Sequence, residues 1–340
     1  MKFTKKQILL LVIVVVIAIF LSAYRLPYYI QKPGGADALN PIVEVVEGYE
    51  SEGDMHLVTV RGGQATPVQY LLAKLLPHQE ILPIHEVRPE GISEEEYIQI
   101  QLQMMDSSQE KAIVVAYEAA QENITIEDNG VYVVSVLEGV PADNILKIGD
   151  LITSIDDIPM QSAEDLIGYV ENKQAGDSIT IAFERGEEKL VESIPLAELE
   201  ELDNNVGIGI SLVTDRKIQV DPEVNFSSGS IGGPSAGLMF SLEIYDQLTE
   251  EDLTKGYEIA GTGEVDYEGN VLRIGGIDKK VIAADREGCD IFFAPNENGA
   301  SNSNYDIAKK TAEEIGTDME IIPVNTFQDA LTYLQELEKK

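Results

Sequence analysis

Residues 260–284 read AGTGEVDYEGNVLRIGGIDKKVIAA, and residues 232–237, further upstream, read GGPSAG. The longer stretch predicts two strands around a turn at Glu268–Asn270, followed after two glycines by a helix. In the shorter stretch the glycines allow the backbone to approach a bound molecule closely, and Pro234 suits a loop that enters a helix. This pattern places Ser235 at or near a helix start within an α/β segment.

Strands and helices alternate on both sides of these stretches. Short apolar runs typical of strands are followed by longer runs with helical spacing, which predicts helices packed on a mixed sheet and therefore an α+β fold. The predicted strands are residues 206–213, 216–224, 289–295 and 319–324, and the predicted helices are residues 236–248, 277–288, 304–316 and 326–339.

Ser235 is the first candidate for chemistry. Near a helix start, unpaired backbone N–H groups and the helix dipole stabilise an oxyanion, which points to the amides from Gly233 to Ala236. A serine nucleophile also needs a base, yet no histidine follows His85 in the sequence. Taken alone, the stretch is also typical of a plain serine that caps a helix.

A buried lysine is the other base that can activate a serine, because burial lowers the pKa of its ammonium group from about 10.4. The predicted helix 277–288 offers Lys279 and Lys280. On a helical wheel Lys280 borders an apolar stripe formed by Ile277, Val281 and Ala284, whereas Lys279 points to the opposite, solvent side. Burial therefore favours Lys280. A surface lysine that only extends along the apolar stripe remains the alternative.

The N-terminus carries an uncharged apolar run, ILLLVIVVVIAIFLSA, at residues 8–23. With its neighbours the run is long enough to cross a bilayer as a helix, so residues 8–24 are predicted to contact the membrane. A cleaved secretory peptide is the competing interpretation, but cleavage after Ala23 would leave bulky Leu21 at the −3 position. Three lysines within the first six residues orient the N-terminus towards the cytoplasm.

The sequence pattern changes at Asn123, and residues 124–197 predict a compact β-rich module. The predicted order is a strand, small residues, a Leu-x-x-Gly-Asp turn, a strand, a helix and a strand. This order resembles a PDZ domain of the bacterial protease type. PDZ domains bind an extended peptide as an additional strand in a groove between a strand and a helix. The alternative is a module that only spaces its neighbours. The predicted groove lies beside the helix 163–172 and the strand residues Gly130, Val131, Tyr132 and Val133.

Composition excludes several classes of function. The chain has 340 residues and a net charge of −36, which argues against binding nucleic acid or anionic lipid headgroups. A single cysteine, Cys289, excludes an internal disulfide. That cysteine and the three histidines, His56, His78 and His85, give no cluster with the spacing of metal ligands, so neither a structural metal nor a cofactor is expected.

The two quoted stretches together resemble the proteolytic domain of Lon proteases. In that family the serine of a GPSAG-type loop pairs with the last lysine of a GG-x-x-x-K helix start, and a TGE strand and a G-x-V-x-x-(I/V)-GG hairpin lie between them. The resemblance implies that Ser235 is the nucleophile, that Lys280 is the general base and that Thr262 holds the lysine by a hydrogen bond. SSGSIG replaces the acidic-Gly approach common in Lon, which leaves the shape of the cleft open.

No G-x-x-x-x-G-K-[ST] loop is present, so an ATPase motor of the Lon type is not expected. A membrane anchor, a PDZ-like module and a Lon-like domain together resemble the PDZ-containing, membrane-anchored Lon-like serine proteases of Gram-positive bacteria. The resemblance implies an ATP-independent endopeptidase in the cell membrane, with its catalytic domain outside the cytoplasm and peptides or proteins there as substrates. Because Lon-like domains often form rings, a homo-oligomer is compatible with this interpretation.

The predicted domain order follows from these segments. Residues 200–234 are too few to supply the strands and the long helix that a Lon-type domain needs upstream of its serine, whereas residues 54–60 and 93–121 predict such elements. We therefore expect the PDZ-like module to be inserted into the catalytic domain. The expected bounds are residues 1–33 for the N-terminus, anchor and linker, 34–122 for the first catalytic part, 123–199 for the PDZ-like module and 200–340 for the Lon-like domain.

A function of another class is a membrane-tethered scaffold that binds peptides in the PDZ-like groove and does no chemistry. Such a protein would carry a degenerate protease domain. Ser235 and Lys280 both stand at their motif positions, which favours the enzyme, because a decayed site loses these residues first.

Overall fold

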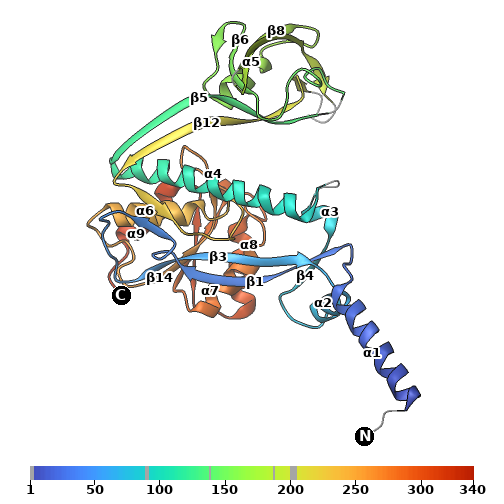
Figure 1. Cartoon of the computed structure of the whole chain (residues 1–340). Helices are drawn as coiled ribbons and strands as arrows, with labels where there is room; N and C mark the ends of the chain where they lie inside the picture. Colours follow the sequence, from blue (N-terminus) through green and yellow to red (C-terminus); the bar gives the residue numbers. More distant parts are fainter. Residues whose placement is uncertain (1–3, 89–91, 138, 187, 200–204) are drawn as a thin grey trace. The chain divides into compact units, whose positions relative to one another are not determined.

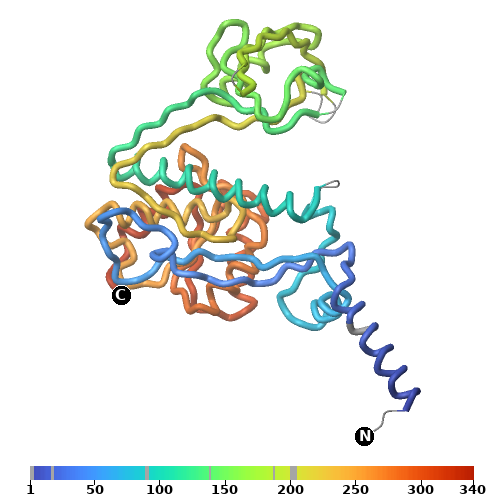
Figure 2. Tube along the Cα trace, in the orientation of Figure 1, coloured from blue at the N-terminus to red at the C-terminus, as the bar shows by residue number. Residues whose placement is uncertain are grey.

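The computed structural model describes residues 4–88, 92–137, 139–186, 188–199 and 205–340. The chain folds into two compact units (Figures 1 and 2). Unit 1 comprises residues 1–123 together with residues 220–340, and unit 2 comprises residues 124–219. Unit 2 therefore lies in sequence between the two parts of unit 1.

Unit 1 is built on one sheet of six strands, in the order β18-β17-β14-β3-β1-β4. Strands β3, β14, β17 and β18 run parallel to one another, whereas β1 is antiparallel to both of its neighbours. The mixed sheet thus combines strands from both parts of the chain. Its strands are β1 (Tyr28–Ala38), β3 (Asp54–Gln64), β4 (Glu80–Pro83), β14 (Glu258–Gly261), β17 (Ile291–Pro295) and β18 (Glu320–Val324).

Helices cover both faces of this sheet, because alternate residues of its strands point to opposite faces. Phe292 packs in a core with α7 and α8, whereas the neighbouring Phe293 ring lies 5.8 Å from that of Tyr333 in α9. Helix α6 shares the face of α9, and the long helix α4 packs on α6. The helices are α4 (Glu94–Ala120), α6 (Gly237–Leu248), α7 (Ile277–Glu287), α8 (Asn304–Ile315) and α9 (Phe327–Glu336).

Smaller elements complete unit 1. Short antiparallel pairs join β2 to β13 and β15 to β16. The N-terminal helix α1 (Lys5–Ala23) is long and apolar enough to cross a membrane, and none of its most apolar window is buried in the protein. The other elements are α2 (Pro67–Ala73), α3 (Ile84–Val87), β2 (Val43–Val45), β13 (Val224–Phe226), β15 (Glu264–Val265), β16 (Val271–Leu272) and the short 3₁₀ helix Glu297–Gly299.

Unit 2 is a small β-rich body with its own apolar core. Its sheet has the order β12-β5-β6-β8-β9, with β7 paired to β6, and α5 (Ala163–Glu171) lies over it. The core is formed by alternate strand residues, including Val131, Ile152 and Ile181, all fully buried. The strands are β5 (Asn123–Val136), β6 (Leu151–Ile155), β7 (Ile158–Pro159), β8 (Ser178–Arg185), β9 (Glu188–Pro195), β10 (Ala197–Leu199), β11 (Asn205–Gly207) and β12 (Ile210–Asp221).

Two sequence-based expectations are wrong at the level of elements. Residues 28–33, expected in the N-terminal segment with the anchor and linker, form the first part of β1, which passes through the sheet with an irregular register between Pro33 and Ala36. Residues 205–219, expected in the catalytic part, belong to unit 2, because β12 pairs with β5. In both cases the segment pairs with a strand far away in the sequence, which local composition does not reveal.

Candidate active site

The loop before α6 brings Ser235 to the edge of a cleft in unit 1. Gly233 has a φ of 91°, in the left-handed region that favours glycine, and its N–H donates to the Gln101 carbonyl of α4 at 2.7 Å. A Cβ atom on Gly232 would lie 2.8 Å from the Cβ of Gln101. The two glycines therefore let the loop pack against α4, and α6 begins directly afterwards, with Ala236 as its N-cap.

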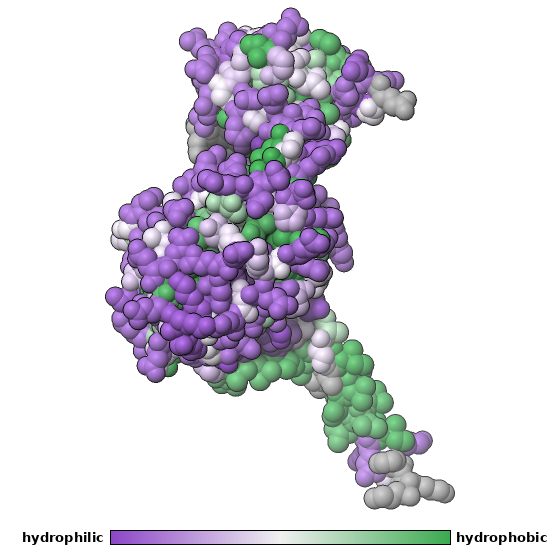
Figure 3. All heavy atoms as spheres, turned by 90° about the vertical axis from the view of Figure 1, so that its left-hand side faces the viewer, coloured by the Kyte–Doolittle hydropathy of each residue, from purple (hydrophilic) through white to green (hydrophobic). Residues whose placement is uncertain are grey.

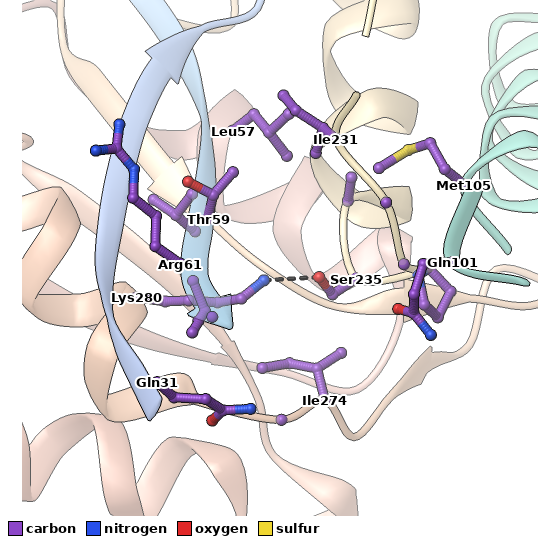
Figure 4. A pocket seen from close by; sticks show the side chains of 18 of the residues that line it. Gln31, Leu57, Thr59, Arg61, Gln101, Met105, Ile231, Ser235, Ile274 and Lys280 are labelled. Atoms are coloured by element: carbon purple, nitrogen blue, oxygen red, sulfur yellow. Dashed lines mark hydrogen bonds between the residues drawn. The ribbon is translucent and has the colours of Figure 1, made fainter. Parts of the chain in front are cut away.

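Lys280 reaches Ser235 from the first turn of α7. The helix follows Gly276, which has a φ of 69°, and the lysine side chain is directed back towards the loop. Lys280 Nζ lies 2.7 Å from Ser235 Oγ, as the dashed line in Figure 4 marks. The sequence separation of these residues is bridged because β14 and α7 lie beside the start of α6.

Thr262, directly after β14, fixes the orientation of the lysine. Its side chain is fully buried, and Thr262 Oγ1 donates a hydrogen bond to the Ser235 carbonyl at 2.9 Å. Because its single proton is used in this bond, the Thr262 hydroxyl accepts a hydrogen bond from Lys280 Nζ, also at 2.9 Å. A neutral amine has two N–H groups and one lone pair. One N–H directed at Thr262 leaves the lone pair free to face Ser235 Oγ.

Burial sets the charge of this lysine. Lys280 is 4% exposed, and desolvation lowers the pKa of its ammonium group to about 7. The hydrogen-bond partners of Nζ are the hydroxyls of Ser235 and Thr262, neither of which carries a charge that would restore the pKa. The lowered pKa makes the neutral form of Lys280 accessible near neutral pH.

The neighbouring Lys279 provides a contrast. It was expected to face solvent, but it is also 4% exposed, and its Nζ lies 2.5 Å from a carboxylate oxygen of Glu80 and 3.0 Å from one of Asp278. Burial alone would lower the pKa of Lys279, but the hydrogen bonds and charges of these carboxylates outweigh it and raise the pKa. Helical periodicity missed this because it includes neither the packing of α7 on β1 and β3 nor the Glu80 carboxylate that β4 supplies.

The backbone amides around Ser235 differ in availability. Gly233 was expected to help bind an oxyanion, but its N–H donates to Gln101 in this structure. Among the described residues, no partner engages the amides of Ser235 and Ala236. These two amides precede the first turn of α6, where the positive end of the helix dipole lies. The arrangement supports an oxyanion bound by the amides of Ser235 and Ala236 and not by the amide of Gly233.

A cleft of about 740 Å³ opens over Ser235 and Lys280. Figure 4 shows β1 and β3 on one side, with Gln31, Thr59 and Arg61, and α4 on the other, with Gln101 and Met105. Sequence reasoning named none of these wall residues. Thr59 lay within the predicted strand 54–60, but β1 was hidden in the segment interpreted as a linker.

The histidines take no part in this arrangement. His56 Nε2 lies 2.7 Å from Glu258 Oε2, in the sheet, and His78 and His85 lie in the turn after α2 and in α3. Among the described residues, the hydrogen-bond partner of Ser235 Oγ is Lys280. A triad that reaches back to a histidine is therefore not supported.

The prediction of the peptide groove in unit 2 is wrong for one of the two walls. The stretch Gly130–Val133 lies inside the sheet, because β5 has β6 on one side and β12 on the other, and Val131 and Val133 are core residues. Tyr132 pairs with Leu151 of β6, so no additional strand fits there.

Strand β12 lies at one end of the strand order, and β9 lies at the other. The predicted helix wall is α5, and the Ala163 amide at its start donates to Thr214 Oγ1 of β12 at 3.0 Å. Strand β12, and not β5, is therefore the strand in contact with the start of α5. The sequence signal for it was the alternating run 206–213, which was assigned to the wrong part of the chain.

Two family models match the chain. Residues 203–336, which contain Ser235, Thr262 and Lys280, match the Lon protease (S16) C-terminal proteolytic domain. Residues 97–196 match the PDZ domain, and this match begins within α4 and ends before β12. The chain therefore carries a Lon-type proteolytic domain and a PDZ domain, and the predicted α+β fold is confirmed.

Curated relatives agree with the first match. A Lon protease from Aster yellows witches'-broom phytoplasma is 33% identical over 129 residues, and one from Campylobacter jejuni is 34% identical over 130 residues. These alignments cover 38% and 35% of this chain. The chain spans only 15% and 16% of the length of these relatives.

Solved structures resemble about a quarter of the chain. The PDZ domain of an SdrC-like protein from Listeria monocytogenes is 40% identical, with 25% of this chain and 88% of that chain covered and a TM-score of 0.23. The second domain of a protein from Listeria is 42% identical, with 26% and 86% covered and a TM-score of 0.24.

Proposed function

We propose that the chain, with its Lon-type proteolytic domain, is a serine endopeptidase that uses Ser235 as nucleophile and Lys280 as general base. One observation carries this proposal: Lys280 Nζ lies 2.7 Å from Ser235 Oγ, buried and without a carboxylate partner. A lysine with a carboxylate, such as Lys279, stays protonated and cannot accept a proton. Helix α7 thus carries both a structural lysine, Lys279, and a candidate base, Lys280.

The acylation step follows from the hydrogen bonds at the site. Neutral Lys280 takes the proton of Ser235, whose oxygen attacks the carbonyl carbon of a peptide bound in the cleft. The amides of Ser235 and Ala236 stabilise the negative oxygen of the tetrahedral intermediate. Protonated Lys280 then donates its proton to the leaving amine, and the peptide bond breaks to leave an ester on Ser235.

Hydrolysis of this ester repeats the same proton transfers with water. Lys280, neutral again, accepts a proton from the attacking water and returns it to Ser235 Oγ when the ester breaks. Thr262 keeps the lysine in place through both half-reactions and is a positioning residue. No nucleotide is required by this chemistry, which is why we propose an ATP-independent enzyme.

Substrate supply is the role we assign to the remaining parts. Helix α1 anchors the chain in the membrane with its N-terminus in the cytoplasm, so the cleft faces exported or membrane-attached peptides and proteins. The edge strand β12 and helix α5 of the PDZ domain recruit an extended segment of the substrate. Two observations support this role: α1 is apolar and exposed, and β12 lies at the end of its sheet.

Two substitutions test the dyad. Ser235→Ala and Lys280→Met should each reduce cleavage of a fluorogenic peptide library by at least about 10³-fold, because they remove the nucleophile and the base. Lys279→Met is the matched control, since it removes an equally buried lysine from the same turn. It should retain cleavage within about tenfold.

The outcome also separates the enzyme from the rival scaffold function. If wild-type protein cleaves no peptide while its PDZ domain binds one, the chain is a membrane-tethered scaffold. If Lys280→Met stays active and substitution of His56, His78 or His85 abolishes cleavage, the base is a histidine. Circular dichroism of each variant checks that the fold persists.

A further inference from the structure

An apolar patch stands out on the surface of unit 1. It consists of exposed side chains on α2 and the turn that follows it, where Leu71 is 61% and Leu75 is 81% exposed. Apolar residues gathered on one exposed face mark a contact with another apolar body. The members of the apolar patch are Val68, Leu71, Leu72, Leu75 and Leu76.

Helix α2 holds this patch in a fixed orientation. Thr66 and Gln69 form a capping box at its start, and Pro67 occupies the first turn. The opposite face of the helix packs into unit 1, where Ala73 joins a small core with Ile30 of β1 and with Ala65. The exposed leucines are therefore presented by a folded helix and by the turn after it, in which the amides of Leu75 and Leu76 donate to the Leu72 carbonyl.

The apolar patch lies beside the end of α1. Only four residues separate Ala23, the last residue of α1, from Tyr28, the first of β1. Leu26 donates its amide hydrogen to the Ala65 carbonyl at 2.8 Å, immediately before α2, and Arg25 Nη1 donates to the Gln64 carbonyl at 2.9 Å. Four residues span at most about 14 Å. If α1 crosses a bilayer, α2 must therefore lie close to the bilayer surface.

Figure 3 agrees with this placement. Apolar atoms cover α1 and continue onto the adjacent underside of unit 1, whereas most of the remaining face is hydrophilic. Aromatic rings that suit a membrane interface accompany this surface: Tyr24 stacks on Phe20 at the end of α1, and Tyr70 of α2 lies against Tyr28. Lys74 Nζ lies 4.7 Å from the centre of the Tyr70 ring, which places a cation at the rim of the patch.

We propose that the apolar patch inserts into the surface of the bilayer that α1 crosses, and that it holds unit 1 against the membrane. The inference rests on the proposed membrane anchor and does not depend on the dyad. The partner is the acyl-chain region of the lipid, not the headgroup, because the exposed residues are leucine and valine. The net charge of −36 also argues against electrostatic attachment to anionic lipid.

The consequence concerns the substrate. Gln31 of β1 and Arg61 of β3 line the cleft, and they lie at adjacent positions of the register that joins these two strands. Gln31 follows the end of α1 by only a few residues. A unit 1 that lies on the bilayer would present this end of the cleft to chains at the membrane surface. Bonds close to a membrane anchor are then cleaved in preference to bonds in freely diffusing peptides.

The chain contains no tryptophan, so one introduced residue reports its own environment. We would place Leu75→Trp in the full chain carrying Ser235→Ala, reconstitute it in zwitterionic phospholipid vesicles, and measure quenching by lipids brominated on their acyl chains. Tyr49→Trp is the control, because Tyr49 is 49% exposed and follows the far end of β1. An eleven-residue strand spans about 35 Å.

The expected result is a blue-shifted emission for Leu75→Trp and at least about twofold quenching by brominated lipid, with little quenching for Tyr49→Trp. Failure of the chain to float with vesicles, or a Leu75→Trp emission that resembles water-exposed tryptophan, would overturn the proposal. A blue shift without bromine quenching would also overturn it, and would indicate a second copy or another protein on the patch. None of these readouts requires catalysis.

A functional variant completes the test. Leu71→Asn combined with Leu75→Asn should lower cleavage of a lipid-tethered peptide several-fold while cleavage of the same untethered peptide stays unchanged. Val191→Asn, a change at an equally exposed residue of unit 2, is the control and should alter neither rate. Equal loss on both peptides would show a folding defect and contradict a role in membrane docking.

Discussion

At the scale of single residues, the chemistry depends on what a buried lysine touches. Lys279 and Lys280 are adjacent in sequence and equally buried, yet carboxylates hold one protonated while hydroxyls leave the pKa of the other near 7. The sequence motif predicted Lys280, but the helical wheel misplaced Lys279. Charge state follows from partners supplied by distant segments, here Glu80 of β4 and Thr262 after β14, which a wheel does not include.

Thr262→Val tests the positioning of the lysine. Loss of the hydroxyl removes the acceptor that directs one N–H of Lys280 away from Ser235, so kcat should fall by about 10–100-fold. The hydroxyl also stabilises the protonated amine by accepting its hydrogen bond, so the pH at which activity is half-maximal should shift downward. Thr262→Ser should restore both kcat and the pH midpoint. Equal loss in both variants with an unchanged midpoint would reduce Thr262 to a packing residue.

At the scale of elements, most helices and several strands could be predicted, but the order of the strands in the sheets could not. Helices 93–121, 236–248 and 277–288 were recognised from capping residues and apolar spacing, which are local signals. Strands β1 and β12 were assigned to the wrong role, because a strand is defined by its partner. Within α4, Ser108 donates its hydroxyl to the Pro234 carbonyl at 2.9 Å, so this polar residue supports the loop of Ser235.

The junction of β1 with β3 offers a matched pair of glycines. A Cβ on Gly34 would overlap the Thr59 carbonyl and side chain, whereas a Cβ on Gly63 would meet nothing within 4 Å. Gly34→Ala should lower the free energy of unfolding by about 2 kcal/mol or more. Gly63→Ala should change it by less than about 0.5 kcal/mol. Urea unfolding of both variants measures the difference, and equal effects would contradict the close packing of β1 on β3.

Helix α6 carries a buried carboxyl that makes stability depend on pH. Burial raises the pKa of Glu243 to about 8, its hydrogen bond from Gln247 opposes this shift, and the charge of Asp246 adds to it. The folded state therefore binds a proton that the unfolded chain loses above its ordinary pKa of about 4.5. This contribution to stability is complete below about pH 4.5 and is lost as the pH rises towards about 8.

Glu243→Gln removes that dependence while retaining a partner for Gln247. The variant should gain stability relative to wild type as the pH rises from 5 to 9, by on the order of 2–4 kcal/mol at the upper end. Denaturant midpoints at several pH values measure the trend. A difference that stays constant with pH would show that Glu243 is ionised in the folded protein.

At the scale of the whole molecule, unit 1 is assembled from segments on both sides of unit 2. Its two chain ends at the boundary lie close together, because the Tyr117 hydroxyl donates to the Pro222 carbonyl. The shortage of residues upstream of Ser235 was the signal that pointed to an insertion. The placement of β12 was not accessible from sequence, since it depends on which of two sheets accepts the strand.

Replacement of residues 124–219 by a short Gly-Ser linker tests this organisation. Unit 1 should fold and cleave small peptides at a rate within about tenfold of the full chain, because the dyad and its cleft lie entirely in unit 1. Cleavage of protein substrates that the PDZ domain is proposed to recruit through β12 and α5 should fall more strongly. Loss of small-peptide cleavage with a retained fold would contradict the independence of the site.

The central claim is that neutral Lys280 activates Ser235, and the pH dependence of kcat/KM tests it most directly. With a peptide that has no titrating groups, kcat/KM should rise about tenfold between pH 6 and pH 8 and level off above, with a midpoint near the pKa of about 7 at Lys280. The small residual rate of Lys280→Met should lack this inflection. A wild-type profile that is flat through pH 7, or an inflection that survives in Lys280→Met, would contradict the account.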